Sequence, residues 1–566
     1  MPIAFALAAS RRTVSSRVAA PIPVARRLGT TAAALALLLV SGCASLHEWC
    51  HNGHEVGPNY RRPCAPVAKQ WIDAGDQRLR NETVDHADWW TVFHDPTLTG
   101  LIHEAYDQNL TVRVAGFRIL QARAQLAISV GNIFPQTQQA YADYMRDLNS
   151  RETATTAFAP RRYNNFDAGF NLAWELDFWG RFRRAIESQD ALLDASIENY
   201  DDVLVTLLSD VATNYVEIRT LQRRVELAAA NVQAIRGSYD IADSRFKNGA
   251  GNEIDLEQAQ TNLSQTEALI PALEQELRRA NNRLCILLGR YPEDLTKTWP
   301  AASIPTPPVE VAVGIPGDLM RRRPDVRRAE RELAAQSAQI GVAESELYPH
   351  ISIIGTIGVE AANFKDLFNS QASYGSIGPS LRWNILNYGR IQNNVVVQQG
   401  RFQELAANYQ NVVLNANEEA ENAIVGFLKS QQRTRALNTG VNAAQKANDL
   451  VLELYKSGRA DFNRVFNIQS FLVTQQDSAT QAAGDVDLNL IDLYRSLGGG
   501  WQIRFEQGDG TTWCERGCSA NCCCPDDYCP KGCPVRPTGT RCDQLQCGPP
   551  PVGCCEKPDR GCIIVH

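Results

Sequence analysis

The 566-residue sequence has no run of 18 apolar residues, so hydropathy predicts no helix that spans a lipid bilayer. The net charge of −7 lacks the basic excess that nucleic-acid binding requires. The phosphate-binding P-loop pattern, the HExxH zinc motif and the nucleophile elbow of serine hydrolases are also missing. These absences argue against an enzyme, a catalytic cofactor and a nucleic-acid partner.

The first 42 residues have the composition of an export signal. Several arginines precede the apolar run at residues 32–40, which ends in the sequence VSGC at residues 40–43. Small residues directly before a cysteine resemble a bacterial lipoprotein cleavage site. We therefore expect a mature chain that begins at Cys43 and carries covalent lipid on its sulfur, which would anchor it to a membrane. An ordinary secretory signal with a cysteine there by chance is the alternative.

The predicted export implies an oxidising compartment, in which the 16 cysteines of the chain can form disulfides. Cys50 and Cys64 are close enough in sequence to pair, and Cys285 lies alone in a helical pattern that predicts a buried thiol. The other twelve lie in the tail, residues 502–566, without paired Cys-x2-Cys spacing. A disulfide knot is the first interpretation of this tail, and thiolate metal capture is the second.

A second candidate metal group lies behind the predicted lipid. Three histidines and one cysteine there could hold a soft metal ion. These residues are His47, Cys50, His51 and His54. A flexible spacer between the lipid and the rest of the chain is the other interpretation.

Two parts of the chain repeat each other at an offset of 209 residues. WELDFWGR at residues 174–181 corresponds to WNILNYGR at 383–390, and RFKNG at 245–249 corresponds to LYKSG at 454–458. We infer that residues 97–299 and 318–501 are two copies of one unit, joined by the proline-rich linker 300–317. Residues 43–96 form the lipid-anchored N-terminal segment.

Each copy predicts the same order of elements: a helix, two strands, a very long helix, a glycine turn and another helix. The first helices are expected at 98–132 and 318–347, each ended by a proline. Apolar and polar residues alternate over 166–177 and 377–385, as in membrane barrel strands. A half-buried strand of a soluble sheet is the alternative for any single stretch.

The longest helices are expected at residues 181–247 and 390–456, which contain no proline. In the first of them, apolar or small residues recur at a mean spacing of about 3.5 residues, which indicates a coiled-coil seam. A helix of this length extends about 100 Å, which suits a span across the periplasm.

The repeated corner at 174–181 and 383–390 lies where each strand region meets its long helix. We expect its aromatic residues at the membrane–water boundary, where amphipathic rings are favoured. They are Trp174, Trp179, Trp383 and Tyr388. Four strands per chain cannot close a barrel, and open strand edges are excluded from lipid. Several chains around one axis are therefore needed, and three would supply twelve strands around an aqueous lumen.

Four segments resemble TolC-type outer-membrane efflux channels. They are WWTVFHDPTLTGLIHEAYDQN (89–109), LAWELDFWGRFRRA (172–185), RRRPDVRRAERELAAQSAQIGVAESELYPHISI (321–353) and LGGGW (497–501). VGPNYRRP at 56–63 is similar to the mature N-terminus of the lipidated branch of this family, which works with RND pumps.

The resemblance implies a mainly α-helical homotrimer whose twelve-stranded membrane β-barrel continues into a long α-helical coiled-coil barrel. It implies a place in outer-membrane lipid with the helices in the periplasm. The function would be passive conduction of small molecules. The partners would be a periplasmic adaptor and an inner-membrane pump of the RND type.

The resemblance also assigns functional residues at the two helix–turn–helix ends. The glycine turns would contact the adaptor, through Gly249, Ala250, Gly251, Gly458, Arg459 and Ala460. The family's channel-closing hydrogen bond maps onto Asp255 and Tyr455. A common aspartate ring of the family falls on Asn467, so that negative constriction is not expected here. Nearby substitutes are Asp461, Arg464 and Phe466. Ordinary coiled-coil surface residues are the alternative.

Two other functions remain open at this stage. One is a lipid-anchored coiled-coil scaffold without a pore, and the other is a metal-sequestering lipoprotein that uses the cysteine-rich tail. The alternating strands favour the conduit, since a scaffold has no need of them.

Overall fold

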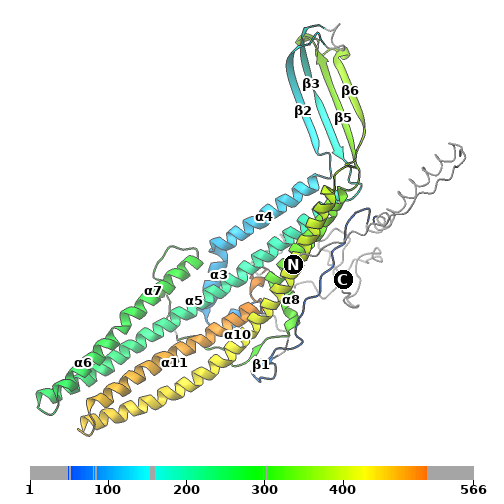
Figure 1. Cartoon of the computed structure of the whole chain (residues 1–566). Helices are drawn as coiled ribbons and strands as arrows, with labels where there is room; N and C mark the ends of the chain where they lie inside the picture. The colour runs from blue at the N-terminus through cyan, green and yellow to red at the C-terminus, as the bar shows by residue number, and fades with distance from the viewer. Residues whose placement is uncertain are drawn as a thin grey trace, which may run out of the picture.

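A computed structural model describes residues 49, 53–80, 82, 86–152, 160–297, 299–300 and 303–505. The molecule is elongated, with a β-sheet at one end and two long helical hairpins at the other (Figure 1). The predicted export signal, Cys43 and the cysteine-rich tail lie outside the described residues.

The sheet has four strands, each antiparallel to its neighbours. They are β2 (Thr137–Leu148), β3 (Arg162–Glu175), β5 (His350–Ala361) and β6 (Ser373–Arg382). Their order is β2-β3-β5-β6, so one hairpin from each half of the chain lies side by side and β2 and β6 form the two edges.

One face of this sheet is apolar, as the alternation in the sequence predicts. In the register of the strands Phe170 lies opposite Ile357, and Gly355 lies opposite Ile377. The Ile377 side chain is 77% exposed, so the described residues leave this part of the face uncovered. The predicted alternation extended to residue 385, but β6 ends at Arg382, and the last residues of the pattern belong to the connection.

The opposite face of the sheet is polar and is linked by hydrogen bonds between strands. The Tyr374 hydroxyl donates to Asp167 at 2.9 Å, and the Thr356 hydroxyl donates to Asn171 at 2.9 Å. The sheet therefore presents opposite chemistry on its two sides.

The two long helices have the predicted bounds. Helix α5 (Arg181–Lys247) and helix α10 (Arg390–Lys456) each contain 67 residues. The Asp177 carboxylate accepts the backbone N–H groups of Phe182 and Arg183, both at 3.0 Å, and so caps α5. Absence of proline allows each helix to continue without a break.

The return helices differ between the two halves. The second half has the single helix α11 (Phe462–Ser496), whereas the first half has α6 (Glu253–Glu267) and α7 (Leu269–Leu287). The sequence predicted one helix in each. The break at Ala268 has a local cause, since Pro271 has no N–H for the Glu267 carbonyl and its ring crowds that group.

The predicted first helices are also divided. Residues 98–132 form α3 (Pro96–Gln108) and α4 (Leu110–Gly131), because the Asn109 side chain caps α4 by accepting the N–H of Thr111 at 2.8 Å. Residues 318–347 form the single turn α8 (Leu319–Arg322) and α9 (Pro324–Ser345). Pro324 disfavours helical geometry at the residue before it.

The main core lies where the hairpins meet the N-terminal and linker segments. Trp89 and Trp90, from the 3-10 turn η1 (Trp89–Phe93), are buried there, and Trp89 stacks on Tyr494 of α11. Strand β1 (Leu79–Arg80) pairs with β4 (Val311–Ala312) of the linker. The remaining short turns are η2 (Leu295–Lys297), η3 (Pro316–Asp318), η4 (Phe364–Asp366), η5 (Ser370–Ala372) and η6 (Trp501–Phe505).

Two of the cysteine predictions fall on described residues. Cys285 is a buried free thiol, as expected, and Cys64 is in a disulfide bond. Cys50, its predicted partner, lies outside the described residues. Over the part of the chain that the structure describes, no helix combines the length and apolar character needed to cross a membrane.

Candidate functional site

The two hairpin ends have the same backbone turn. We call residues 245–255 the first tip and residues 454–464 the second tip. The Ala250 N–H donates to the Arg245 carbonyl at 2.8 Å, and the Arg459 N–H donates to the Leu454 carbonyl, also at 2.8 Å. Both turns are therefore closed by an equivalent bond, 209 residues apart.

Glycine is required at one position of each turn. Gly249 has φ +73° and Gly458 has φ +72°, in the left-handed region that side chains with a Cβ rarely adopt. All six predicted turn residues lie at the tips, namely Gly249, Ala250, Gly251, Gly458, Arg459 and Ala460. Whether they contact an adaptor remains a prediction.

Helices α6 and α11 also begin in the same way. The Asn252 side chain accepts the Asp255 N–H at 2.7 Å, and the Asp461 side chain accepts the Arg464 N–H at 2.9 Å. Asp461 is thus an N-cap, in addition to any part in a gate.

A small apolar core joins the two tips. Tyr455 is 1% exposed, and its ring meets Phe462 edge-on at 5.4 Å. Phe466 packs against the margin of this core, whereas Asn467 is exposed and donates to Asn463 at 3.4 Å. Of these gate candidates, Tyr455 is the one held inside the chain.

The Asp255 charge acts on Tyr455, but the two side chains are not hydrogen-bonded here. The Tyr455 hydroxyl is buried without a hydrogen-bond partner among the described residues. Burial raises the pKa of Tyr455, and the Asp255 charge raises it further. Burial also raises the pKa of Asp255, against the lowering effect of Arg245. The predicted closing bond is therefore not formed in this arrangement, and the gate role stays a prediction.

Arg245 is the residue at the tips that the sequence did not single out. Its guanidinium donates to the Tyr455 carbonyl and, at 3.2 Å, to the Ala250 carbonyl, and it lies 4.7 Å from the centre of the Tyr455 ring. One signal was present: the corresponding position of the second tip, 209 residues later, is Leu454, so only one of the two similar turns has the arginine.

The aromatic residues of the repeated corner hold strands to helices. The Trp174 indole donates to the Ile133 carbonyl at 2.8 Å, and the Trp383 indole donates to the Leu347 carbonyl at 3.0 Å. These acceptors follow α4 and α9, so both halves use the same contact. Each tryptophan thereby fixes the end of a strand to the end of a helix.

The other two corner aromatics differ. Trp179 donates to the Pro349 carbonyl at 2.9 Å, whereas Tyr388 is 96% exposed with φ +51°. Their place at a membrane boundary stays a prediction. Trp49 stacks on Phe178 at 5.2 Å, so the segment that follows the predicted lipid site rests against this corner.

The candidate metal site behind the predicted lipid is described only at His54, since His47, Cys50 and His51 lie outside the described residues. The His54 ring lies 4.5 Å from that of Trp49, and its carbonyl accepts a bond from Arg183 at 2.9 Å. In the described ranges no three His, Cys, Asp or Glu side chains cluster as metal ligands would.

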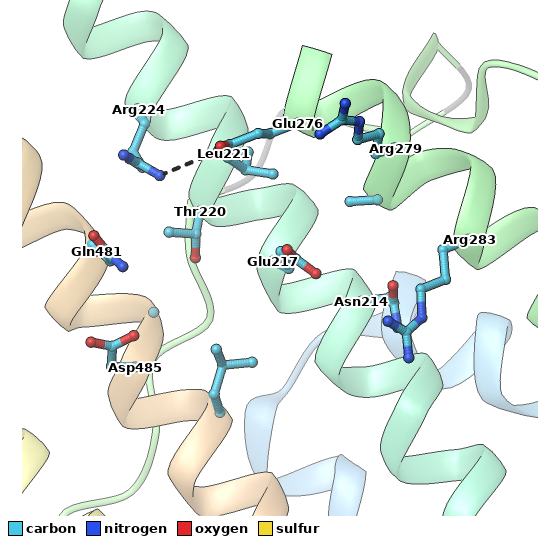
Figure 2. A pocket seen from close by; sticks show the side chains of 13 residues that line it. Asn214, Glu217, Thr220, Leu221, Arg224, Glu276, Arg279, Arg283, Gln481 and Asp485 are labelled. Atoms are coloured by element: carbon cyan, nitrogen blue, oxygen red, sulfur yellow. Dashed lines mark ion pairs between the residues drawn. The ribbon is translucent and has the colours of Figure 1, made fainter. Parts of the chain in front are cut away.

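A groove of about 490 Å³ lies between α5, α7 and α11 (Figure 2). Arg224 on its wall bonds Asp477 at 2.8 Å. Arg279 and Arg283 line the groove from α7. Glu217, Glu276 and Asp485 place acidic groups in the same groove. The groove thus contains both positively and negatively charged side chains, and it favours neither an anionic nor a cationic ligand.

Solved structures share this fold. The outer-membrane channel OprN is 31% identical, with a TM-score of 0.74, and the match covers 79% of this chain and 99% of that one. A crystal structure of CusC, a protein that forms a transmembrane channel, is 26% identical with a TM-score of 0.71, and the match covers 79% of this chain and 100% of that one. The fold is that of outer-membrane channel proteins.

Sequence comparison identifies the family. The model of the outer membrane efflux protein family matches residues 101–290 and 315–499. Nodulation protein T of Rhizobium leguminosarum bv. trifolii is 32% identical over 454 residues, covering 79% of this chain and 92% of that protein. The cation efflux system protein CusC of Escherichia coli O6:H1 is 28% identical over 452 residues, covering 80% and 96%. The chain belongs to the outer membrane efflux protein family and is an outer-membrane efflux channel protein.

Proposed function

We propose that three copies of this chain close a twelve-stranded barrel in the outer membrane and that their hairpins continue it as a helical tunnel through the periplasm. The observation that carries this proposal is the open sheet, whose edge strands β2 and β6 have no partner within the described chain. Unpaired strand edges are not tolerated in lipid, so the edges require neighbouring copies.

The strand directions allow this closure. Because four antiparallel strands alternate in direction, β6 of one copy and β2 of the next also run antiparallel. The apolar face then meets lipid and the hydrogen-bonded polar face lines the lumen. Two copies would give eight strands, a number that side chains fill, whereas three leave an aqueous channel.

The helices offer a second surface for neighbouring copies. Helix α4 exposes an apolar row along one side, including Val114 and Phe117, the latter 60% exposed. A row of this kind is unfavourable in water and indicates a protein contact. The two halves have long helices of equal length and equivalent tips. We therefore infer that each chain contributes two duplicated helical hairpins to the wall of the tunnel.

The partners and cargo follow from the relatives. Similar proteins are described as a toluene efflux pump outer membrane protein and as a probable outer membrane lipoprotein. We infer that this chain is likewise lipidated, at Cys43, and works with an inner-membrane pump of the RND type through a periplasmic adaptor at the tips. It conducts small molecules passively, and the pump selects them. A pore-free scaffold would give no reason for the two opposite faces of the sheet.

The number of chains per particle tests the proposal. The full-length protein, extracted in mild detergent, is expected to have the mass of three chains once bound detergent is subtracted. A stable monomer would contradict the trimer and leave the sheet edges unexplained.

The gate is tested at Asp255 and Tyr455. We expect Asp255→Ala combined with Tyr455→Phe to raise single-channel conductance, because the buried Tyr455 hydroxyl has no partner among the described residues and, in our proposal, bonds Asp255 when the tips close. Glu253→Ala, which removes a nearby exposed carboxylate, is the control and should leave conductance unchanged. Equal conductance in the double variant and the wild type would remove these residues from the gate.

A further inference from the structure

Arg245 connects the two hairpins of one chain at their tips. It belongs to the last turn of α5, yet its guanidinium donates to the Tyr455 carbonyl in the last turn of α10. A second bond, at 3.2 Å, goes to the Ala250 carbonyl of the first tip. One side chain therefore bonds the backbone of both tips.

The position is favourable for a positive charge. Helices α5 and α10 both end at the tips, so the partial negative charges of their C-termini come close together. A guanidinium between them reduces this repulsion and gives the Tyr455 carbonyl a second donor beside the Gly458 N–H, which lies 3.0 Å from it. It also lies 4.7 Å from the centre of the Tyr455 ring, where the ring face attracts a cation.

Other polar ties between the hairpins lie farther from the tips. Gln469 of α11 donates to Ser238 of α5 at 2.7 Å, and Arg224 bonds Asp477 at 2.8 Å. Loss of the contact at Arg245 would thus leave the ends of the hairpins joined only by the apolar core around Tyr455, while these bonds keep the rest of the bundle together.

We propose that Arg245 is a positioning residue that fixes the second tip against the first within each chain, so that the two tips move as one body when the tunnel changes its width. This inference rests on the proposed function, in which the tips form the gate. The second copy has no equivalent arginine, because Leu454 occupies the corresponding position. The contact is therefore made by the first tip alone. Without Arg245 the apolar core around Tyr455 still joins the tips, but the second tip loses its polar contact with the first and moves more freely.

A distance measurement between the tips tests this role. Nitroxide side chains are introduced as unnatural amino acids at Asn248 and Ser457, which are exposed and lie one on each tip. Labelled chains are mixed with an excess of unlabelled chains, so that distances within one chain dominate. In Arg245→Ala we expect a broader distance distribution, with the ratio of separated to joined tips raised roughly tenfold, the factor for losing one charge-assisted hydrogen bond.

Two further variants separate positioning from general damage. Arg236→Ala removes the same charge from α5, but Arg236 pairs with Glu267 at 2.7 Å within the first hairpin, so the distribution should stay narrow. Arg245→Lys keeps the charge and one bond, and should restore part of the narrow distribution. An unchanged distribution in Arg245→Ala, or equal broadening in Arg236→Ala, would overturn the proposal.

Conductance distinguishes this inference from the channel function itself. In planar bilayers Arg245→Ala is expected to conduct several-fold more than the wild type, and Arg236→Ala the same as the wild type. If the wild type does not conduct, the channel function fails, while the distance measurement still decides the role of Arg245. If the wild type conducts and Arg245→Ala conducts equally, the role of Arg245 in the gate is contradicted.

Discussion

Asp487 lies in α11 with none of its surface exposed, and neither carboxylate oxygen has a hydrogen-bond partner among the described residues. Burial raises its pKa to about 8. In the unfolded chain an aspartate has a pKa near its usual value of about 3.9. The folded protein therefore holds a proton on Asp487 over a pH range in which the unfolded chain has lost it.

This difference predicts a pH dependence of stability. Because the folded state binds the extra proton, the contribution of Asp487 to the free energy of unfolding falls as pH rises from about 4 to about 8 and is constant above that. Asp487→Asn removes the titration. We expect the variant to gain unfolding temperature over the wild type as pH rises from 5 to about 8. A difference that stays constant over that range would contradict the assignment.

Single residues such as Asp487 and Arg245 were not predictable from the sequence. Both are charged residues at helical spacing, and most such residues lie on a solvated face. Only the packing of α11 shows that Asp487 is buried, and only the meeting of two distant tips gives Arg245 its acceptors. The glycines of the turns were predictable, because their conformation excludes most other residues.

Arg323 joins three helices at the start of α9. Its guanidinium donates to the Ser496 carbonyl at the end of α11 at 3.0 Å and to the Glu419 carboxylate of α10 at 2.7 Å. A further bond, also at 2.7 Å, goes to Asp325 in the first turn of α9. The side chain thereby fixes the proline-determined break before α9 against both helices of the second hairpin.

Loss of this contact is expected to destabilise the helical bundle. Arg323→Ala leaves a buried carbonyl without a donor and should cost about 2 kcal/mol. Arg433→Ala is the matched control, since Arg433 also bridges α10 and α11, through Asp485 at 2.9 Å, but is largely exposed. Its cost should stay below about 1 kcal/mol. Thermal unfolding followed by circular dichroism compares them, and equal effects would contradict the role of Arg323.

The bounds of a helix were predictable where residues at its two ends signal where it begins and ends. The long helices have a glycine before each and another just after it, with no proline between, and both predicted ranges agree with the structure. The breaks at Asn109, Ala268 and Arg323 were missed. Pro271 and Pro324, which account for two of these breaks, were visible in the sequence.

At the level of the whole chain, the sequence predicted the parts more completely than their arrangement. The repeated corner and the alternating strands predicted where the sheet meets the helices. They did not show that β3 of the first half pairs with β5 of the second, because strand pairing between distant segments has no local signal. The prediction of several copies came from strand counting, and the unpaired edges at β2 and β6 give it a structural basis.

Single-channel recording of the purified full-length wild type in planar bilayers tests the central claim most directly. The account predicts discrete current steps of one size, which scale linearly with voltage, because a lumen lined by the polar face of the sheet is filled with water. Protein that inserts into the bilayer without any current step would contradict it.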